Sequence, residues 1–428
     1  GSSAPGLRAS LNYFSGGVAT ISPATALPAI ADPAILNAQT QPGFAGTPIV
    51  RLDGAGAGGG VDGLSLASGG TGSTVRGLML TRFSNDGLVI QANANGVNVA
   101  GNWIGTDGSG STTMGNTWDG IEIFGANATI GGTGANDRNV IVNNVQEGIN
   151  VSGASASGNV IRGNYIGLEP DGSSGAGNGD VGIALVACGG GNTIGGLTAA
   201  ERNVISMNFE GIEISCANNV VRGNYIGTDA TGTLNRGQRS SDAVQIITGG
   251  TGNVIGGTAA GAGNLIAFTK SGKSGVSVQA GTGNAVLGNS IHSNTALGID
   301  LGNNGVVTPN DGAKTAGQPN LLMDFPVFTS ATLSGTTLTV AGYVGSAPNQ
   351  ATFANARVEL FKSDNDPTGY GEGQTYLGFL TSDANGNVSG SLTVSGLAAG
   401  DRITGTATDG SNNTSEFGAN VTVAAPGY

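Results

Sequence analysis

The sequence is poor in charged residues, aromatic residues, histidine and cysteine, and these shortages exclude several classes of protein. Charged residues make up 10% of the 428 residues and aromatic residues 5%. The single histidine, His292, excludes a histidine-based metal site and a Ser-His-Asp triad. Two cysteines are too few for a small disulfide scaffold. No run of about 18 apolar residues occurs, so we expect no membrane insertion.

Basic residues are the scarcer charged class. The chain has 16 Lys and Arg against 28 Asp and Glu, which gives a formal net charge of −12. Proteins that bind nucleic acids or anionic membranes use a positively charged surface, so we expect neither partner. The same argument counts, less strongly, against a polyanionic glycan.

Glycine is abundant, with 80 residues. It does not recur at every third position, which excludes collagen. Short triplets of Val, Ile and Leu recur throughout the chain, which argues against a disordered linker. A chain of this length exceeds one ordinary hydrophobic core and predicts two domains or an elongated repeat array.

The chain contains a repeat. A Gly-Asn-aromatic-Ile-Gly motif begins at Gly101, Gly163 and Gly223, with spacings of 62 and 60 residues. A second motif, Ile-Gly-Gly, lies between the copies, and each unit ends in a strand of the Gly-Ile-X-Ile type, as at 120–123 and 211–214. The repeat is therefore a pair of coils of about 19 to 31 residues, each with two or three short strands.

These features predict an all-β fold whose main part is a right-handed parallel β-helix of about ten coils. In its strands Ile121 and Ile123 point inward and Glu122 points outward, and stacking the coils buries the apolar residues in one column. Asparagines recur at the corners because Asn tolerates left-handed φ and its amide can pair with the next coil: Asn102, Asn164, Asn224 and Asn289. A β-propeller is the alternative, but it needs four strands in each blade of about 40–50 residues.

The pattern divides the chain into four parts. We predict an N-terminal cap over 1–17, the β-helix over 18–302 and a linker or C-terminal cap over 303–319. Residues 320–428 alternate like an antiparallel immunoglobulin-like β-sandwich, without the inter-sheet cysteine pair.

Every second coil carries a long loop, at 106–119, 168–180 and 228–242, and we expect these loops to form a low wall beside the Gly-Ile-X-Ile strands. Acidic residues precede or begin those strands in successive coils, stacked about 4.8 Å apart if the register holds. They are Asp86, Asp119, Glu147, Asp180, Glu210 and Asp242.

Four carboxylates of this line are candidate catalytic groups: Asp180, Glu210, Glu213 and Asp242. Glycoside hydrolysis uses two carboxyl groups about 5–10 Å apart, and a stack of like charges raises some of their pKa values. Turn residues on a solvated face, or a divalent-cation site, are the other interpretations. Few basic residues lie on this face, which disfavours a polysaccharide lyase.

The same face offers a ligand-binding set, Trp118, Asp119, Glu122 and Arg239. Trp103, Tyr165 and Tyr225 share one repeat position and predict a stacked ladder on the coils, whereas Trp118 lies in a loop and is the candidate for stacking on a sugar.

We expect no cofactor other than calcium. Asp311, Asp364 and Asp366 lie in turns rich in Gly and Asn, where oxygen ligands for Ca²⁺ are available, although ordinary Asx turns would use the same residues. Cys188 and Cys216 follow the Gly-Ile strands of adjacent coils by six and five residues, an offset that allows a coil-to-coil disulfide in an oxidising compartment. Two buried thiols are the alternative.

Motifs over most of the chain resemble those of large bacterial surface and secreted right-handed β-helix proteins. They include 223–233 with 253–266, Leu297–Gly302 and the segment 318–327, while 369–378 and 413–417 resemble the immunoglobulin-like module that often follows. The resemblance implies this fold and an extracellular, surface or adhesive role, and it brings no catalytic motif.

Two functions follow from these observations. The first is a secreted bacterial structural or adhesive protein at the cell surface, which self-associates into a fibre or presents a glycan-binding face. The second is a secreted enzyme that acts on a polysaccharide, a glycoside hydrolase rather than a lyase. An enzyme needs a cleft where the acidic line meets a wall and an aromatic side chain.

Overall fold

The computed structural model describes residues 17–364 and 366–426. It is all-β: within these residues the only helices are short 3-10 turns of three or four residues, η1 to η7. They are Ala38–Thr40, Gly54–Gly56, Ser68–Gly70, Thr112–Met114, Ala199–Glu201, Pro319–Leu322 and Ala351–Phe353. The predicted N-terminal cap over 1–17 lies almost wholly outside the described residues.

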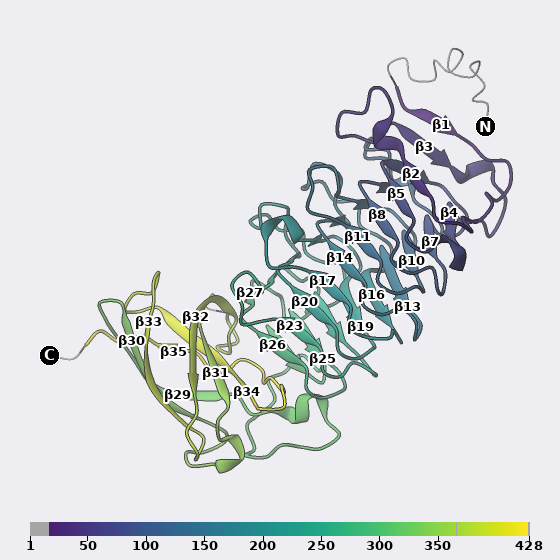
Figure 1. The fold of residues 1–428 in the computed structure, drawn as a ribbon. Helices are drawn as coiled ribbons and strands as arrows, with labels where there is room; N and C mark the ends of the chain where they lie inside the picture. Colours follow the sequence, from purple (N-terminus) through teal and green to yellow (C-terminus); the bar gives the residue numbers. More distant parts are fainter. Residues whose placement is uncertain (1–16, 365, 427–428) are drawn as a thin grey trace.

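Three long parallel sheets run along one axis and form a parallel β-helix, which excludes the propeller (Figure 1). Sheet A has ten strands, in the order β1 (Ala19–Ile21), β3 (Val50–Asp53), β6 (Leu78–Thr81), β9 (Trp103–Ile104), β12 (Val140–Ile141), β15 (Tyr165–Ile166), β18 (Val204–Ile205), β21 (Tyr225–Ile226), β24 (Leu265–Ala267) and β27 (Ser290–His292).

Sheets B and C have nine strands each. Sheet B contains β4 (Leu64–Leu66), β7 (Leu88–Ile90), β10 (Ile121–Ile123), β13 (Ile149–Ser152), β16 (Val181–Val186), β19 (Glu210–Ile214), β22 (Val244–Ile246), β25 (Val276–Val278) and β28 (Ile299–Leu301). Sheet C contains β2 (Ile35–Asn37), β5 (Thr74–Arg76), β8 (Asn98–Ala100), β11 (Thr129–Gly131), β14 (Val160–Arg162), β17 (Thr193–Gly195), β20 (Val220–Arg222), β23 (Val254–Gly256) and β26 (Ala285–Leu287).

One apolar column fills the β-helix. Ile121 pairs with Ile149 on the next coil and Ile123 with Val151, and all four side chains are fully buried. A single coil has too little apolar area to be stable by itself, so the stack of coils is what stabilises the fold.

Ladders of asparagine side chains follow the corners. In each rung the backbone N–H and the side-chain amide of one Asn donate to the Oδ1 of the Asn one coil further on, as from Asn139 to Asn164 at 3.2 and 2.9 Å. The pairing agrees with the sequence prediction, but its conformational reason is wrong. The ladder asparagines are buried, and the residues with positive φ are the glycines before them: Gly101, Gly163, Gly223 and Gly288.

The aromatic residues of sheet A do not form the expected ladder of stacked rings. Register places Val140 between Trp103 and Tyr165, and Val204 between Tyr165 and Tyr225, because the aromatic motif occurs only on every second coil. Two arginine guanidinium groups cover the tyrosine rings instead, Arg138 over Tyr165 at 4.0 Å and Arg202 over Tyr225 at 3.9 Å from the ring centroids.

The long loops between sheets A and B contact one another along the axis. Thr106 Oγ1 in the first loop donates to Glu169 Oε2 in the second at 2.9 Å, and Ala230 N in the third donates to Gly172 O in the second at 2.8 Å. The loops therefore form a continuous wall beside sheet B.

The C-terminal domain contains two antiparallel sheets with seven strands in all. One sheet has β29 (Pro326–Ser334), β30 (Thr337–Val344) and β33 (Asn387–Thr393). The other has β31 (Arg357–Ser363), β32 (Gly373–Thr381), β34 (Arg402–Thr408) and β35 (Val421–Thr422).

This domain lies against the last coil of the β-helix (Figure 1). Phe361 and Phe417 are buried with the residues of the β-helix column. Three of its glutamates accept hydrogen bonds from the last coil: Glu359 from Gly288 N at 2.8 Å, Glu372 from Asn294 N at 2.8 Å and Glu416 from Leu301 N at 2.9 Å. The C-terminal domain therefore covers the end of the stack of coils. The sequence predicts residues 303–319 as a linker or as this cap.

Candidate functional site

A row of acidic residues lies where the chain enters sheet B, at one equivalent position in each coil. The hydrogen bonds Gly63 N to Asp86 O, Gly87 N to Asp119 O and Gly120 N to Glu147 O define this position. It holds Asp62, Asp86, Asp119, Glu147, Val181, Glu210 and Asp242 in successive coils. We call these residues the acidic row.

The register corrects the prediction for Asp180. Glu210 pairs with Val181, so Asp180 lies one residue earlier and the acidic row is interrupted at its coil. The interruption is a substitution, because Val181 stands before Gly182 where the neighbouring coils have an acidic residue before glycine, while Asp180 is aligned with Gln146. Asp62, which sequence reasoning missed, extends the row in the opposite direction.

In several members of the acidic row, one carboxylate oxygen accepts a hydrogen bond from a backbone N–H of the next coil. Asp86 Oδ1 accepts from Asp119 N at 2.9 Å, Asp119 Oδ1 from Glu147 N at 3.0 Å and Asp242 Oδ1 from Ser274 N at 2.7 Å. An acidic side chain here therefore has a structural role, because it satisfies a backbone donor that the parallel ladder leaves unpaired.

Asp86, Asp119 and Glu122 form the densest part of the site. They are 5%, 0% and 7% exposed, and ligand atoms from the three carboxylates all lie within 4.8 Å of one another. The sequence placed Glu122 on an outward, solvated face. It does project away from the apolar column, but the neighbouring coils cover it.

Burial and mutual repulsion disfavour the charged forms of this cluster. Burial raises the pKa of Asp86 to about 6, and the charges of Asp62 and Glu147 add to the effect. Burial, followed by Glu147 and Glu122, raises the pKa of Asp119 far above its usual range, and burial also raises the pKa of Glu122.

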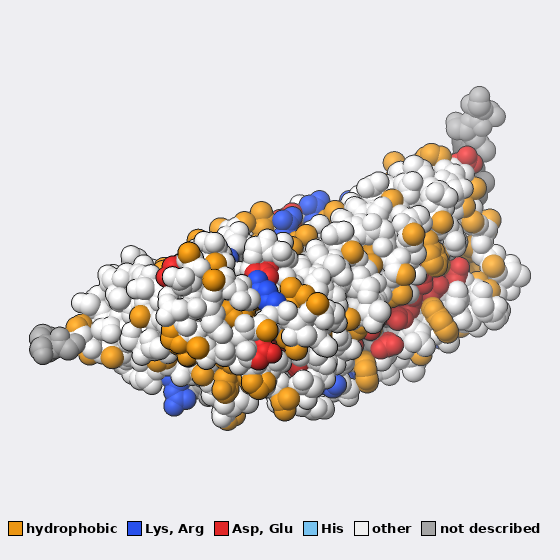
Figure 2. All heavy atoms as spheres, turned by 90° about the horizontal axis from the view of Figure 1, so that it is seen from below, with side chains coloured by type: hydrophobic (Ala, Val, Ile, Leu, Met, Phe, Trp, Pro, Cys, Tyr) orange, Lys and Arg blue, Asp and Glu red, His pale blue; other side chains and the backbone are white. Residues whose placement is uncertain are grey.

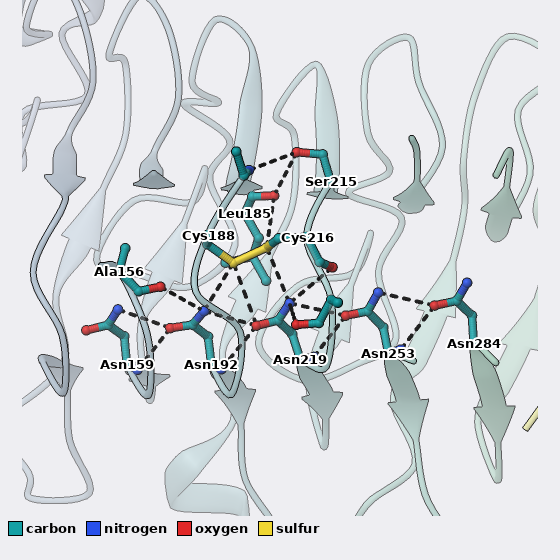
Figure 3. The surroundings of a disulfide bond; sticks show 12 residues. Ala156, Asn159, Leu185, Cys188, Asn192, Ser215, Cys216, Asn219, Asn253 and Asn284 are labelled. Atoms are coloured by element: carbon teal, nitrogen blue, oxygen red, sulfur yellow. Dashed lines mark hydrogen bonds between the residues drawn. A yellow bond between two sulfur atoms is a disulfide. The ribbon is translucent and has the colours of Figure 1, made fainter. Parts of the chain in front are cut away.

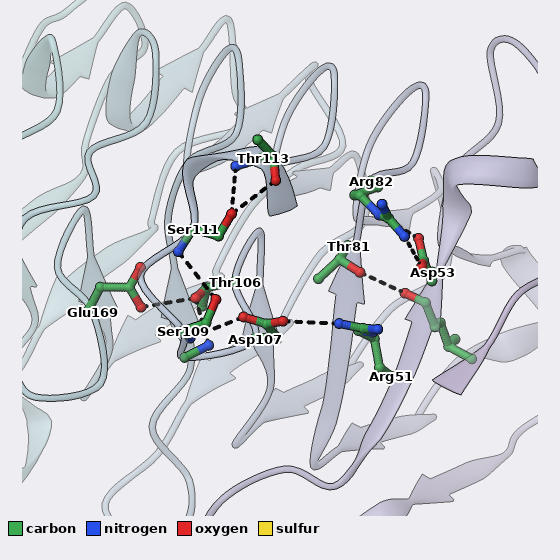
Figure 4. A network of polar contacts seen from close by, with 12 residues as sticks. Arg51, Asp53, Thr81, Arg82, Thr106, Asp107, Ser109, Ser111, Thr113 and Glu169 are labelled. Carbon is green, nitrogen blue, oxygen red and sulfur yellow. Dashed lines mark hydrogen bonds and ion pairs between the residues drawn. The ribbon is translucent and has the colours of Figure 1, made fainter. Parts of the chain in front are cut away.

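Two acidic side chains near the N-terminal end of the β-helix, in contrast, pair with arginines. Buried Asp53 accepts from Arg82 Nε at 2.8 Å, and Asp107 accepts from Arg51 at 3.0 Å (Figure 4). Within residues 17–364 and 366–426, no Lys or Arg forms an ion pair with Asp86, Asp119 or Glu122.

The four candidate catalytic carboxylates are close enough to influence one another, but only two of them are accessible. Burial raises the pKa of Glu210 to about 8, with additions from Glu213, Asp242 and Asp180. Glu210 and Asp242 are buried, whereas Asp180 and Glu213 are half-buried. Burial also raises the pKa values of Asp180, Glu213 and Asp242.

Neutral donors occupy the two buried members of this set. Ser241 Oγ donates to Glu210 at 3.0 Å, and the side-chain amide of Gln245, oriented to donate, lies 2.7 and 2.9 Å from its two oxygens. Asp242 has a donor on each oxygen, Ser274 N and Ser277 Oγ, at 2.7 and 2.8 Å. This is the environment of buried structural acids.

Exposed apolar side chains lie beside the acidic row. Trp118 is 50% exposed, Val145 55% and Phe209 41%. Backbone hydrogen bonds connect Trp118 to Gln146, then to Asp180 and Phe209, so the Trp118 and Phe209 positions lie three coils apart on one line. Figure 2 shows a line of acidic side chains along the β-helix, flanked by hydrophobic ones.

The remaining member of the predicted ligand-binding set, Arg239, contacts backbone carbonyl groups. Arg239, predicted as a ligand contact, donates through Nη2 to the carbonyl oxygens of Asn178 and Gly179, so its guanidinium joins the third loop to the coil beneath it.

The predicted calcium ligands act as turn acceptors. Asp311 accepts from Ala313 N and Asp366 from Thr368 N, both at 2.8 Å, which are Asx turns. Asp364 accepts from Ser293 N at 2.9 Å and from Glu372 N at 3.1 Å, at the boundary between the domains. In the described part of the chain, Asp86, Asp119 and Glu122 are the acidic side chains whose carboxylate oxygens lie close enough together to contact one ion.

Cys188 and Cys216 form a disulfide between adjacent coils, with their Cα atoms 5.4 Å apart. The bond lies next to an asparagine ladder that runs from Asn159 through Asn192 and Asn219 to Asn284 (Figure 3).

Comparisons with known proteins identify no family. No family model matches the chain. In a separate respect, no helix among the described residues is long and apolar enough to span a membrane. One solved structure with local similarity is the adhesin domain of Epf from Streptococcus pyogenes. It is 13% identical over 25% of this chain and 34% of that chain, with a TM-score of 0.20. So small a similarity leaves the geometry of the acidic face as the basis for any functional argument.

Proposed function

We propose that this chain is an extracellular adhesive protein of the cell surface, a rigid β-helix that binds a glycan along its acidic face. The observation that carries the proposal is the line from Trp118 to Phe209 beside the acidic row. Exposed aromatic rings stack on the apolar faces of sugars, and the half-buried carboxylates Glu147, Asp180 and Glu213 can accept hydrogen bonds from sugar hydroxyl groups. With coils about 4.8 Å apart, the two aromatic positions are about 14 Å apart along the axis. This separation suits a polysaccharide lying along the β-helix.

Two further features support this role. A disulfide between coils suits an oxidising, extracellular compartment. The negative charge of the face favours a neutral glycan over a polyanionic one. The bacterial origin suggested by the sequence motifs belongs to the same proposal.

The geometry of the last coil bears on the proposed self-association. Glu359, Glu372 and Glu416 occupy donors of this coil, so its edge is not available for head-to-tail growth. We therefore favour a glycan-binding rod over a fibre built by stacking through this end. Analytical ultracentrifugation would test this choice: a monomer is expected, and a concentration-dependent series of oligomers would overturn it.

A glycan array of neutral and acidic polysaccharides tests the main proposal. We expect binding to neutral chains, and Trp118→Ala weakens it by roughly tenfold, which corresponds to about 1.4 kcal/mol. Leu197→Ala is the matched control, because Leu197 is 41% exposed but lies in the turn between sheets C and A. Equal losses in both variants, or no binding on the whole array, would refute the proposal.

The hydrolase alternative is tested on the same panel by measuring reducing ends. Glu213 and Asp180 are the accessible members of the candidate catalytic set, so their variants are informative. Release of reducing ends that Glu213→Gln abolishes would replace the adhesive role by glycoside hydrolysis. Binding without release supports the adhesive role.

A further inference from the structure

We propose that Asp86, Asp119 and Glu122 bind a divalent cation, with Ca²⁺ as the favoured ion. The three side chains come from two adjacent coils, where β7 and β10 begin, and almost no part of them reaches solvent. Binding of an ion here does not depend on glycan binding, so the two proposals can fail separately.

The spacing of the carboxylates fits one coordination shell. Ca²⁺ binds oxygen ligands at about 2.3–2.6 Å, so two ligands on opposite sides of an ion are about 5 Å apart. Oxygens from Asp86, Asp119 and Glu122 all lie within 4.8 Å of one another. Glu147, half-buried on the next coil, lies near enough for its charge to act on all three.

Two oxygens of the cluster lack a hydrogen-bond partner within the described residues: Asp119 Oδ2 and Glu122 Oε1. The other oxygen of each has a donor, Glu147 N for Asp119 and Asn150 Nδ2 for Glu122. A buried carboxylate oxygen without a partner destabilises the folded state unless a proton, a water molecule or a cation satisfies it.

Asp242 provides an internal comparison. It occupies the same row and also accepts a backbone N–H of the next coil, from Ser274. Its second oxygen, however, accepts from Ser277 Oγ at 2.8 Å. Ser277 is the outward residue of β25, the strand one coil beyond Asp242. The equivalent residue for Asp119 is Asn150 on β13, which has no hydroxyl group and donates to Glu122.

The chemistry of the ligands indicates which ions are excluded. All the metal-ligand atoms at this site are carboxylate oxygens, which hard cations prefer. Zinc and copper sites, in contrast, use His or Cys. The single His292 is on β27, at the far end of sheet A, and both cysteines are in the disulfide. Mg²⁺ demands a regular octahedron and retains several waters, which suits this dry and irregular group of oxygens less well than Ca²⁺.

Isothermal titration of the metal-free protein with CaCl₂, up to about 10 mM, tests the site, with thermal unfolding in Ca²⁺ and in EDTA as a second measurement. We expect one ion per chain and a higher unfolding temperature with Ca²⁺. Asp119→Asn keeps the acceptor for Glu147 N and removes the charge, and Glu122→Gln changes the other unpaired oxygen. Each variant weakens binding by roughly tenfold or more, because calcium affinity follows the number of charged ligands.

Asp242→Asn is the matched control and retains the affinity of the original chain. An absence of heat and of any shift in unfolding temperature with Ca²⁺ or Mg²⁺ would overturn the proposal, and protons shared among the carboxylates would then be what stabilises the cluster. Equal loss of binding in Asp119→Asn and Asp242→Asn would also overturn it, because the ion would not then be held at the cluster.

Discussion

Glu372 accepts hydrogen bonds from both the backbone N–H and the side-chain amide of Asn294, each at 2.8 Å, across the boundary between the two domains. Asn294 follows β27, the last strand of sheet A, so its backbone donor has no further coil to bind. Glu359 and Glu416 make comparable contacts next to sheets C and B. The antiparallel domain therefore completes the hydrogen bonding of the β-helix on all three sides.

Replacing Glu372 tests how much this boundary contributes to stability. Glu372→Ala leaves two buried donors of Asn294 unsatisfied, at about 1–3 kcal/mol each, so we expect the free energy of unfolding to fall by about 2–6 kcal/mol. Urea unfolding followed by circular dichroism measures the change. Asp32→Ala, an exposed acidic residue at the other end of the β-helix, is the control and stays within about 0.5 kcal/mol. If the two variants behave alike, the cap does not stabilise the rod.

The same boundary predicts a dependence of stability on pH. Burial raises the pKa of Glu372 to about 8 and that of Glu416 to about 7, with the charges of Asp364 and Asp366 adding at Glu372 and that of Asp300 at Glu416. The folded state thus holds protons that the unfolded chain releases near pH 4.5, so the free energy of unfolding falls as pH rises from about 5 to 8.

Urea unfolding at pH 5, 6, 7 and 8 measures this slope. Glu372→Gln cannot titrate, and its slope is expected to be shallower than that of the original chain. A free energy of unfolding that rises over this interval would contradict the sign of the predicted effect.

The asparagine ladder beside the disulfide predicts a large effect at Asn219. Its Oδ1 accepts from the backbone and the side chain of Asn192 at 3.1 and 3.0 Å, and its Nδ2 donates to Asn253 Oδ1 at 3.2 Å (Figure 3). Asn219→Leu leaves buried groups on both neighbouring coils unpaired, so we expect a loss of about 3 kcal/mol or more in thermal or urea unfolding.

Asn218, the preceding residue, gives the control for this substitution. It has φ of 61°, a conformation that glycine adopts without strain, so Asn218→Gly is expected to be nearly neutral. A loss as large as that of Asn219→Leu would mean that the corner, rather than the ladder, determines stability here.

Removing the disulfide tests the pairing of Cys188 with Cys216. The two residues are 28 apart in sequence, and closing a loop of this length stabilises the folded state by about 3–4 kcal/mol. We expect the double variant Cys188→Ser, Cys216→Ser to lose about this amount in urea unfolding. The original chain treated with a reducing agent should reach the same value, and an unchanged midpoint in both cases would contradict the prediction.

Much of the fold follows from the sequence alone, because the β-helix is periodic. The spacing of the Gly-Asn-aromatic-Ile-Gly motif and the alternation around Ile121 and Ile212 predict stacked coils, since each coil must bury its apolar face against the next. The seven strands of the C-terminal domain follow from local alternation in the same way.

The site depended on register and on contacts between distant residues. The residue directly before Gly182 is Val181, so Val181 and not Asp180 pairs with Glu210, and the strand register made this one-residue difference plain. The different environments of Asp119 and Asp242, which share one repeat position, come from the residues that neighbouring coils place beside their second oxygens.

The sequence by itself determined that short apolar strands repeat and must stack, because that requirement is local and recurs in every coil. Only the tertiary structure decided which carboxylates are buried without a partner and which cover the end of the stack. Glu372 lies 78 residues from Asn294, and Glu416 lies 115 residues from Leu301. Contacts over such separations depend on how two domains pack, for which the repeat carries no signal.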